Sequence, residues 1–345
     1  MLLLLSAGLR HTAPVRLSCF VLLLAAAATL HTQDVRAQDV NVRVSPDVKT
    51  GIEGTTEFPT IQMALDHHPF PGAHGRVFIH IAPGVYHERL NITQNHPNIT
   101  LVGMGKGPED VVITNSLNAK EAGGTFFTET VEVDGTGFEA DNVTFENTAG
   151  NTGQAVAIVV RADRAVFKHC RFLGHQDTLF ADYGRQYYVD SYIEGGVDFI
   201  FGNAAAVFDH DEIHSNGRGY LTAQSRTSAD QTTGYVIVHS RVTADPAVAS
   251  IFLGRPWRPY ARVVFMETEL PANINPAGWN NWGKASNEQT AWYGEYRNSG
   301  PGSQSAERVA WEHRLTAAEA KRFLPQSFLA GADHWDPIAA AARLP

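Results

Sequence analysis

Cysteine is scarce in this chain, since only Cys19 and Cys170 occur among its 345 residues. Cys19 lies in an N-terminal segment that we expect to be removed, which leaves Cys170 alone. A single thiol excludes a disulfide within the mature monomer. The fold must therefore be stabilised by packing and hydrogen bonding.

Long apolar runs are equally rare, because only Leu17–Leu30 qualifies. This run is short for a membrane span, since a helix that crosses a bilayer about 30 Å thick needs roughly 20 residues. Arg10 and Arg16 precede the run and the small-residue sequence Val35–Ala37 follows it, as in an export signal. We predict a signal peptide at 1–37 and a secreted or periplasmic mature chain at 38–345 without membrane association. An uncleaved membrane anchor is the alternative.

Positive charge is in deficit, with 27 Lys and Arg against 36 Asp and Glu and a formal net charge of -9. Such a chain lacks the basic surface that drives nucleic-acid binding, so we expect no nucleic-acid partner. It should approach a polymer whose carboxyl groups are masked more easily than a fully ionised polyacid.

Several motifs of other hydrolases are missing. No Gly-x-Ser-x-Gly sequence of serine esterases and no His-Glu-x-x-His sequence of zinc proteases occurs. The 15 histidines show no metal-ligand spacing either. We therefore expect no metal and no cofactor.

Tight hairpin signals are rare as well, since Asn216-Gly217 is the only good hairpin dipeptide in the central region. Short strand-like segments recur there instead, at 142–145, 165–168, 186–189, 206–209, 235–238 and 262–265. Counting from Val143 to Val166, Tyr188, Val207, Val236 and Val264 gives steps of 23, 22, 19, 29 and 28.

A strand period of twenty-odd residues is typical of a solenoid in which each coil is one rung. We therefore predict an all-β fold, a single-stranded right-handed parallel β-helix with short capping helices at its ends. An amphipathic pattern at 58–65 and a capping box at 316–319 indicate these helices. A β-sandwich or a propeller is the alternative.

Four polar residues follow this period. The step from Gln154 to Gln176 equals the step from Gln176 to Asp198, and the step from Asp177 to Asp198 is shorter by one. Residues one coil apart in a parallel β-helix lie about 4.8 Å apart, so these side chains should form a polar column. In a strand starting at Asp198, Phe199 and Phe201 should point one way and Asp198 and Ile200 the other.

Two carboxylates one rung apart and beside aromatic rings cannot both ionise freely, so one pKa should be raised. This arrangement predicts one ionised nucleophile and one proton donor, Asp198 and Asp177. The alternative is a ladder of stacked polar side chains that only satisfies buried hydrogen bonds.

A third cluster is Leu253-Gly254-Arg255-Pro256-Trp257. A guanidinium can clamp a carboxylate in bidentate fashion and keep it ionised. An exposed Trp offers an apolar face on which a sugar ring can stack. The alternative is a surface turn with a buried Trp.

These segments together resemble the signature blocks of pectin methylesterases. The matching sequences, in chain order, are Gly84-Val85-Tyr86-His87-Glu88, Phe145-Glu146-Asn147-Thr148-Ala149-Gly150, Gly153-Gln154-Ala155-Val156-Ala157, Gly174-His175-Gln176-Asp177-Thr178-Leu179, Val197-Asp198-Phe199-Ile200-Phe201-Gly202, Leu253-Gly254-Arg255-Pro256-Trp257 and Tyr293-Gly294-Glu295-Tyr296. The resemblance runs from about residue 45 to about residue 330. It implies that 38–345 forms one catalytic β-helix domain that hydrolyses the C6 methyl esters of homogalacturonan.

The resemblance also implies roles for single residues. Asp198 would be the nucleophile that forms an acyl-enzyme, and Asp177 the acid and then the base. Gln154 and Gln176 would bind the oxyanion, and Arg255 would orient Asp198. Trp257, Phe180, Phe201 and Thr125 would contact methyl-esterified pectin.

The chain departs from many plant members in two ways. Ser191 stands where they carry a second cysteine, and no room exists for their long inhibitor-like region. Both features favour a bacterial-type enzyme. Three interpretations compete with this one. They are a β-helix lyase acting on pectin, which would need a calcium site of clustered acids, a polygalacturonase, which often carries an Asp-Asp pair, and a polysaccharide-binding solenoid without activity.

Overall fold

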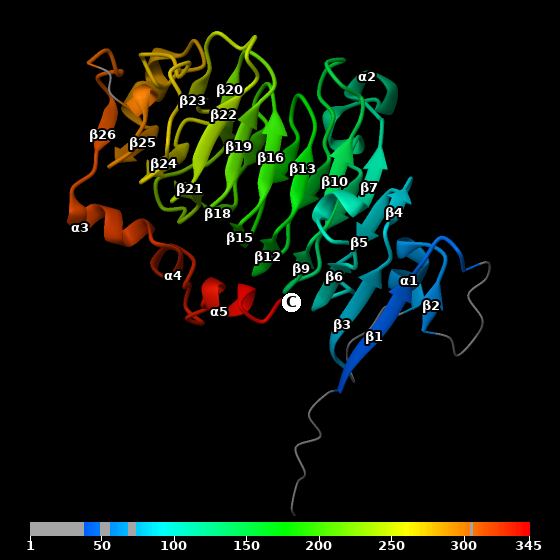
Figure 1. Ribbon diagram of the computed structural model, residues 1–345. Helices are drawn as coiled ribbons and strands as arrows, with labels where there is room; N and C mark the ends of the chain where they lie inside the picture. Colours follow the sequence, from blue (N-terminus) through cyan, green and yellow to red (C-terminus); the bar gives the residue numbers. More distant parts are fainter. Residues whose placement is uncertain (1–37, 49–55, 68–73, 304–305) are drawn as a thin grey trace, which may run out of the picture. The chain divides into compact units, whose positions relative to one another are not determined.

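The computed structural model describes residues 38–48, 56–67, 74–303 and 306–345. The predicted signal peptide at 1–37 lies outside these residues. Within them, parallel strands form three sheets, and strands that are consecutive in the chain belong to different sheets over most of its length (Figure 1). This arrangement is the predicted parallel β-helix, because each coil between residues 74 and 254 contributes one strand to each sheet in turn.

Sheet A holds the first strand of each coil. In spatial order its strands are β2 (Glu57–Phe58), β1 (Gln38–Val44), β3 (His74–Ile81), β6 (Ile99–Gly103), β9 (Glu139–Asp141), β12 (Ala165–Lys168), β15 (Arg185–Val189), β18 (Ala205–Asp209), β21 (Gly234–Val238), β24 (Arg262–Met266), β25 (Trp292–Tyr296) and β26 (Glu312–Arg314).

Sheets B and C hold the second and third strands of each coil. Sheet B consists of β22 (Arg241–Ala244), β19 (Glu212–Ser215), β16 (Tyr192–Gly195), β13 (Arg171–Leu173), β10 (Thr144–Asn147), β7 (Val111–Asn115) and β4 (Gly84–Tyr86). Sheet C consists of β23 (Phe252–Gly254), β20 (Tyr220–Gln224), β17 (Ile200–Gly202), β14 (Leu179–Ala181), β11 (Ile158–Val160), β8 (Val131–Val133) and β5 (Leu90–Ile92).

The repeat that we counted in the sequence is mostly that of sheet A, with two errors of register. The predicted strand at 142–145 overlaps β10 of sheet B, whereas Val166 pairs with Glu139 in sheet A. Val166 and Val207 align with Tyr187 and not with Tyr188. Because side chains alternate along a strand, this slip of one residue exchanges the inner and outer faces.

The core is a column of apolar side chains enclosed by the three sheets. Phe167 stacks on Tyr188 at a ring-centroid distance of 4.9 Å, and Tyr188 stacks on Phe208 at 4.7 Å. All three rings are fully buried. Such stacking is possible because equivalent positions of consecutive coils lie one above the other.

Replacing Phe208 with Ala should lower the free energy of unfolding by about 3–5 kcal/mol, because it opens a cavity inside this stack. Urea unfolding followed by circular dichroism measures the change. Tyr183→Ala is the matched control, since that ring is 67% exposed. Its expected effect is within about 0.5 kcal/mol. Equal losses in the two variants would contradict the assignment of the aromatic stack as core.

Short helices accompany the coils. They are α1 (Ile61–His67), α2 (Ala119–Ala122), α3 (Ala317–Ala320), α4 (Pro325–Phe328) and α5 (Pro337–Ala341), with 3₁₀ turns η2 (Pro108–Asp110), η3 (Thr125–Phe127), η4 (Ala285–Gln289), η5 (Pro301–Ser303) and η6 (Lys321–Phe323). None of the helices in the described part of the chain is long and apolar enough to span a membrane.

The helices near the two ends of the domain cover different surfaces. Ile61, Ala64 and Leu65 of α1 join the core beside β1 and β5, as the amphipathic pattern predicted. Thr316 and Glu319 form the predicted capping box of α3. The segment from α3 to α5 then follows the outer face of sheet A, where Phe323 and Leu329 join the cluster that contains Val207 (Figure 1).

Candidate active site

The polar column predicted from the sequence lies just before the strands of sheet C. Gln154 and Gln176 form a parallel bridge, and Gln176 forms the next one with Val197. The backbone N–H of Asp177 donates to the carbonyl of Val197 at 3.1 Å. One coil therefore separates Asp177 from Asp198, and the two acids occupy corresponding positions of neighbouring coils.

Both aspartates lie in the left-handed backbone region, with φ of 64° for Asp177 and 50° for Asp198. Regular alternation therefore begins only after Asp198, at the start of β17. Phe199 and Ile200 both point into the core, whereas Phe201 lies on the outer face. The predicted alternation was wrong here, because it assumed an extended strand from Asp198 onward.

Arg255 clamps Asp198 through two hydrogen bonds. Its Nε donates to Oδ1 at 2.9 Å and its Nη2 donates to Oδ2 at 2.6 Å. The Asp198 residue is only 6% exposed. A buried carboxylate is costly unless it is paired, and this bidentate geometry is the strongest pairing that a side chain can supply. Both oxygens of Asp198 are therefore held in a fixed direction.

Two aromatic residues hold the guanidinium of Arg255 in turn, and neither was predicted from the sequence. Cζ of Arg255 lies 3.9 Å from the ring centroid of Tyr220 and 3.8 Å from that of Trp282. Tyr220 lies one coil beyond Asp198, and its carbonyl accepts from the Asp198 N–H at 2.8 Å. The coil period could have indicated Tyr220. Trp282 has no such signal, since it lies in a loop beyond β24.

The two carboxyl groups differ in their electrostatic surroundings. Burial raises the pKa of Asp177 to about 8, the charge of Asp198 adds to the rise, and Arg255 opposes it. Burial also raises the pKa of Asp198, but the hydrogen bonds and the charge of Arg255 oppose this rise. The pair thus favours a protonated Asp177 beside an ionised Asp198 at neutral pH.

The two glutamines of the column keep their amide groups available. Gln154 and Gln176 are half-buried, and neither side chain forms a hydrogen bond to another residue in the described ranges. Their carbonyls accept backbone hydrogen bonds from Ala119 and Ala155, which fixes the main chain. Two amide donors therefore lie on neighbouring coils next to the carboxylate pair.

An aromatic cluster covers the outer face of sheet C beside the acids. Phe180 and Phe201 stack at a centroid distance of 4.4 Å with an interplanar angle of 3°. Trp257 packs against Phe201 at 6.0 Å, and Phe126 packs against Phe180 at 5.3 Å. Phe180 and Phe201 are 5% and 4% exposed, so Trp257 and Phe126 present more of the surface.

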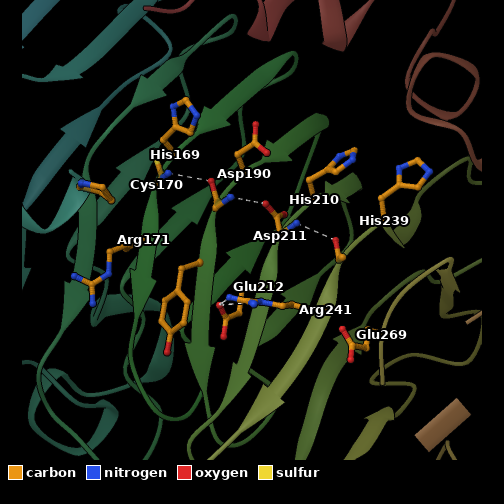
Figure 2. A pocket seen from close by; sticks show the side chains of 14 residues that line it. His169, Cys170, Arg171, Asp190, His210, Asp211, Glu212, His239, Arg241 and Glu269 are labelled. Carbon is orange, nitrogen blue, oxygen red and sulfur yellow. Dashed lines mark hydrogen bonds and ion pairs between the residues drawn. The ribbon is translucent and has the colours of Figure 1, made fainter. Parts of the chain in front are cut away.

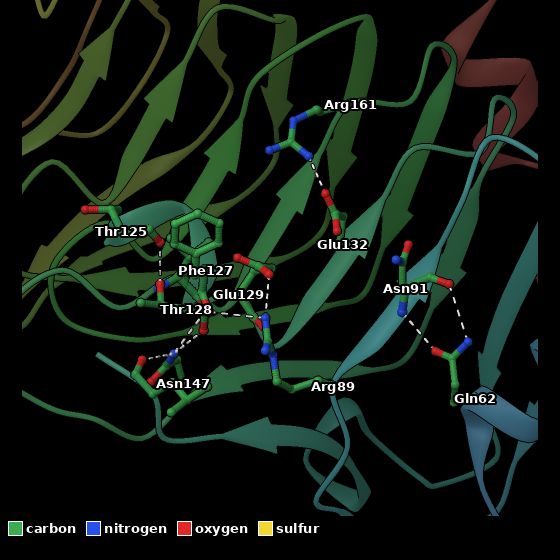
Figure 3. A network of polar contacts seen from close by, with 12 residues as sticks. Gln62, Arg89, Asn91, Thr125, Phe127, Thr128, Glu129, Glu132, Asn147 and Arg161 are labelled. Carbon is green, nitrogen blue, oxygen red and sulfur yellow. Dashed lines mark hydrogen bonds and ion pairs between the residues drawn. The ribbon is translucent and has the colours of Figure 1, made fainter. Parts of the chain in front are cut away.

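Thr125 begins η3 and precedes Phe126 of this cluster in the sequence. Figure 3 shows Thr125 with Phe127 and Thr128. Its carbonyl accepts hydrogen bonds from the N–H and the hydroxyl of Thr128. The buried amide of Asn147 donates to the carbonyl of Thr128 at 3.1 Å and so anchors the turn to sheet B. Phe126 is 50% exposed and was not singled out from the sequence.

Fold and site together define a parallel β-helix protein that carries an arginine-clamped acid pair beside an aromatic surface. The model of the Pectinesterase family matches residues 47–332. The chain belongs to the Pectinesterase family.

Individual relatives agree with this assignment. The chain is 43% identical over 299 residues to Pectinesterase 31 from Arabidopsis thaliana, a match that covers 84% of this chain and 92% of that protein. It is 40% identical to Pectinesterase 1 from Citrus sinensis, about half of whose length (51%) it spans. The solved pectin methylesterase from carrot is 36% identical, with a TM-score of 0.78 and coverage of 85% of this chain and 94% of that one.

The expectation of a bacterial-type enzyme is not supported, because these three relatives come from plants. The length of the chain ahead of the matched region is not diagnostic, since the match covers 92% of the Arabidopsis relative. Ser191 is not diagnostic of origin either. Its hydroxyl accepts a hydrogen bond from the backbone N–H of Cys170 at 3.0 Å, and Cys170 is buried and free.

Proposed function

We propose that this chain is a pectinesterase that hydrolyses the C6 methyl esters of homogalacturonan through an aspartyl acyl-enzyme. The observation that carries the proposal is the carboxyl group of Asp198, paired with Arg255, next to an Asp177 whose pKa is raised to about 8. One group can attack an ester carbonyl while its neighbour holds the proton that the leaving group needs.

In the first half of the reaction, a carboxylate oxygen of Asp198 bonds to the ester carbonyl carbon. The amides of Gln154 and Gln176 donate to the oxyanion that develops. The carbon–methoxy bond then breaks, and methanol leaves with the proton of Asp177. The product is an anhydride between Asp198 and the uronate carboxyl.

In the second half, the carboxylate of Asp177 takes a proton from water as the water oxygen attacks the same carbonyl. The bond to Asp198 breaks, which frees the uronic acid and restores the ionised nucleophile. Arg255 stabilises Asp198 again as its charge returns, because the guanidinium stays clamped between Tyr220 and Trp282.

Pectin would bind over the aromatic cluster, with Trp257 as the principal stacking face and Phe180, Phe201 and Thr125 at its border. A methyl-esterified polymer suits such an apolar surface, since it lacks the carboxylate charges that would need pairing. We further propose that residues 1–37 are a signal peptide and that 38–345 act as a secreted or periplasmic monomer without membrane contact.

Incubation with highly methylated pectin should release methanol, even with EDTA present, without forming an unsaturated product. Enzymatic methanol detection and ultraviolet absorbance measure the two outcomes. A lyase acting on pectin would instead give the unsaturated product, and one that depends on calcium would also lose activity with EDTA. Absence of methanol from a folded sample would refute the proposed function.

A further inference from the structure

A second polar column runs along the corner between sheets A and B. The residue that follows each sheet A strand there adopts the left-handed conformation, as it does at His169, Asp190, His210, His239 and Glu267, with φ between 48° and 52° except for 58° at His210. Equivalent positions of consecutive coils stack, and the side chains of His169, Asp190, His210 and His239 line a groove of about 910 Å³ (Figure 2).

Two imidazoles of this column converge on one carboxylate. Nδ1 of His210 and Nδ1 of His239 lie 2.8 Å and 2.9 Å from Oδ1 of Asp209, the last residue of β18. The two ring centroids are 5.0 Å apart. Both histidines are exposed, whereas Asp209 is only 4% exposed. Two imidazoles that line the groove therefore meet a buried carboxylate at this corner, and transition metals prefer such groups as ligands.

Neighbouring side chains orient Asp209 and His239, in the way that hydrogen-bond partners behind metal ligands orient those ligands. The hydroxyl of Tyr187 donates to Oδ2 of Asp209 at 2.8 Å, which leaves Oδ1 facing the imidazoles. Nε2 of His239 lies 3.3 Å from Oε2 of Glu267. A carboxylate on the far nitrogen of a histidine fixes its ring and tautomer, and directs the near nitrogen to a metal.

We propose that Asp209, His210 and His239 bind one divalent transition-metal ion, Zn²⁺ or Cu²⁺, at this corner. One ligand atom from each residue lies within 4.8 Å of the others. An ion about 2.0–2.2 Å from each atom would fit between them after small side-chain rotations. Imidazole with carboxylate is a donor set that suits Zn²⁺ and Cu²⁺.

The spacing explains why no metal was expected from the sequence. His210 and His239 lie far apart along the chain, at a spacing that matches no metal-binding motif. In this fold, however, that spacing is one coil, because Val207 pairs with Val236. The site lies at the corner between sheets A and B, whereas the catalytic acids precede strands of sheet C. The proposed metal therefore takes no part in ester hydrolysis.

The test uses the full protein without a histidine tag, titrated with ZnCl₂ by calorimetry and with CuCl₂ by electron paramagnetic resonance. The expected result is one tight site whose Cu²⁺ spectrum shows coupling to two nitrogens. His210→Asn and His239→Asn should each weaken binding by about tenfold or more. Asn tolerates the left-handed conformation, so these variants should keep the backbone.

His169→Asn is the matched control. His169 occupies the same corner with a φ of 49°, and its Nδ1 lies 3.1 Å from Asp141, but no second imidazole joins that pair among the described residues. The metal affinity of this variant should stay within about twofold of that of the unmodified protein. This change is much smaller than the loss of about tenfold or more expected when a ligand is removed. Equal weakening by His169→Asn, or none by His210→Asn and His239→Asn, would overturn the proposal.

Discussion

Replacing Asp198 with Asn is expected to lower kcat for methanol release by about 10⁴-fold or more, because the proposed nucleophile is lost. The amide can keep one hydrogen bond with Arg255, and Asn tolerates the φ of 50° found at this position. The loss should therefore be chemical and not structural. Initial rates on methylated pectin measure it, and circular dichroism checks the fold.

Asp190→Asn is a suitable control for this experiment. Asp190 has a φ of 52°, close to that of Asp198, but it lies exposed at the corner between sheets A and B. Its substitution should leave kcat within about twofold, as expected of a surface change away from the site. Turnover by Asp198→Asn near that of the control would exclude Asp198 as the nucleophile.

Replacing Asp177 with Asn should reduce kcat by about 10²- to 10⁴-fold, the usual contribution of a general acid and base. Asp198 remains, so some acyl-enzyme can still form. A rapid-quench burst of methanol measures the first step, and the steady-state rate measures the whole cycle. Activity equal to that of the unmodified enzyme would rule out Asp177 as the proton donor.

The pH profile distinguishes this role from a structural one. Asp177 must be protonated to start the reaction, so activity of the unmodified enzyme should fall as the pH rises through its pKa of about 8. Asp198 must be ionised, so activity should also fall in acid, below its raised pKa. The residual activity of Asp177→Asn should lack the alkaline decline and keep the acid one.

Much of the fold could be predicted from the sequence because a solenoid repeats its strands at nearly constant intervals. The segments 165–168, 206–209, 235–238 and 262–265 all fall within strands of sheet A. The first counted segment belongs to sheet B instead, and Tyr188 was counted one residue out of register. The period gives the number of residues in a coil, but it does not show which turn of the coil contains an extra residue.

The candidate site could be predicted to a similar degree. The order and spacing of Gln154, Gln176, Asp177 and Asp198 indicated neighbouring coils, and the backbone bridges agree. The equal step from Gln176 to Asp198 was one residue out of register, because Gln176 pairs with Val197 and Asp198 corresponds to Asp177. Their chemical roles remain proposals. Tyr220 was missed although the coil period could have indicated it. Trp282 was missed because it lies in a loop beyond β24, and its contact with Arg255 depends on the path of that loop.

The sequence by itself determined the class of fold and the set of polar residues that face each other, because residues one period apart must stack in a parallel solenoid. Only the tertiary structure decided the left-handed conformation of both acids, the aromatic clamp on Arg255 and the meeting of His210 with His239 at Asp209. These features depend on the geometry of single turns and on coils of unequal length, and a constant strand period counted in the sequence contains neither.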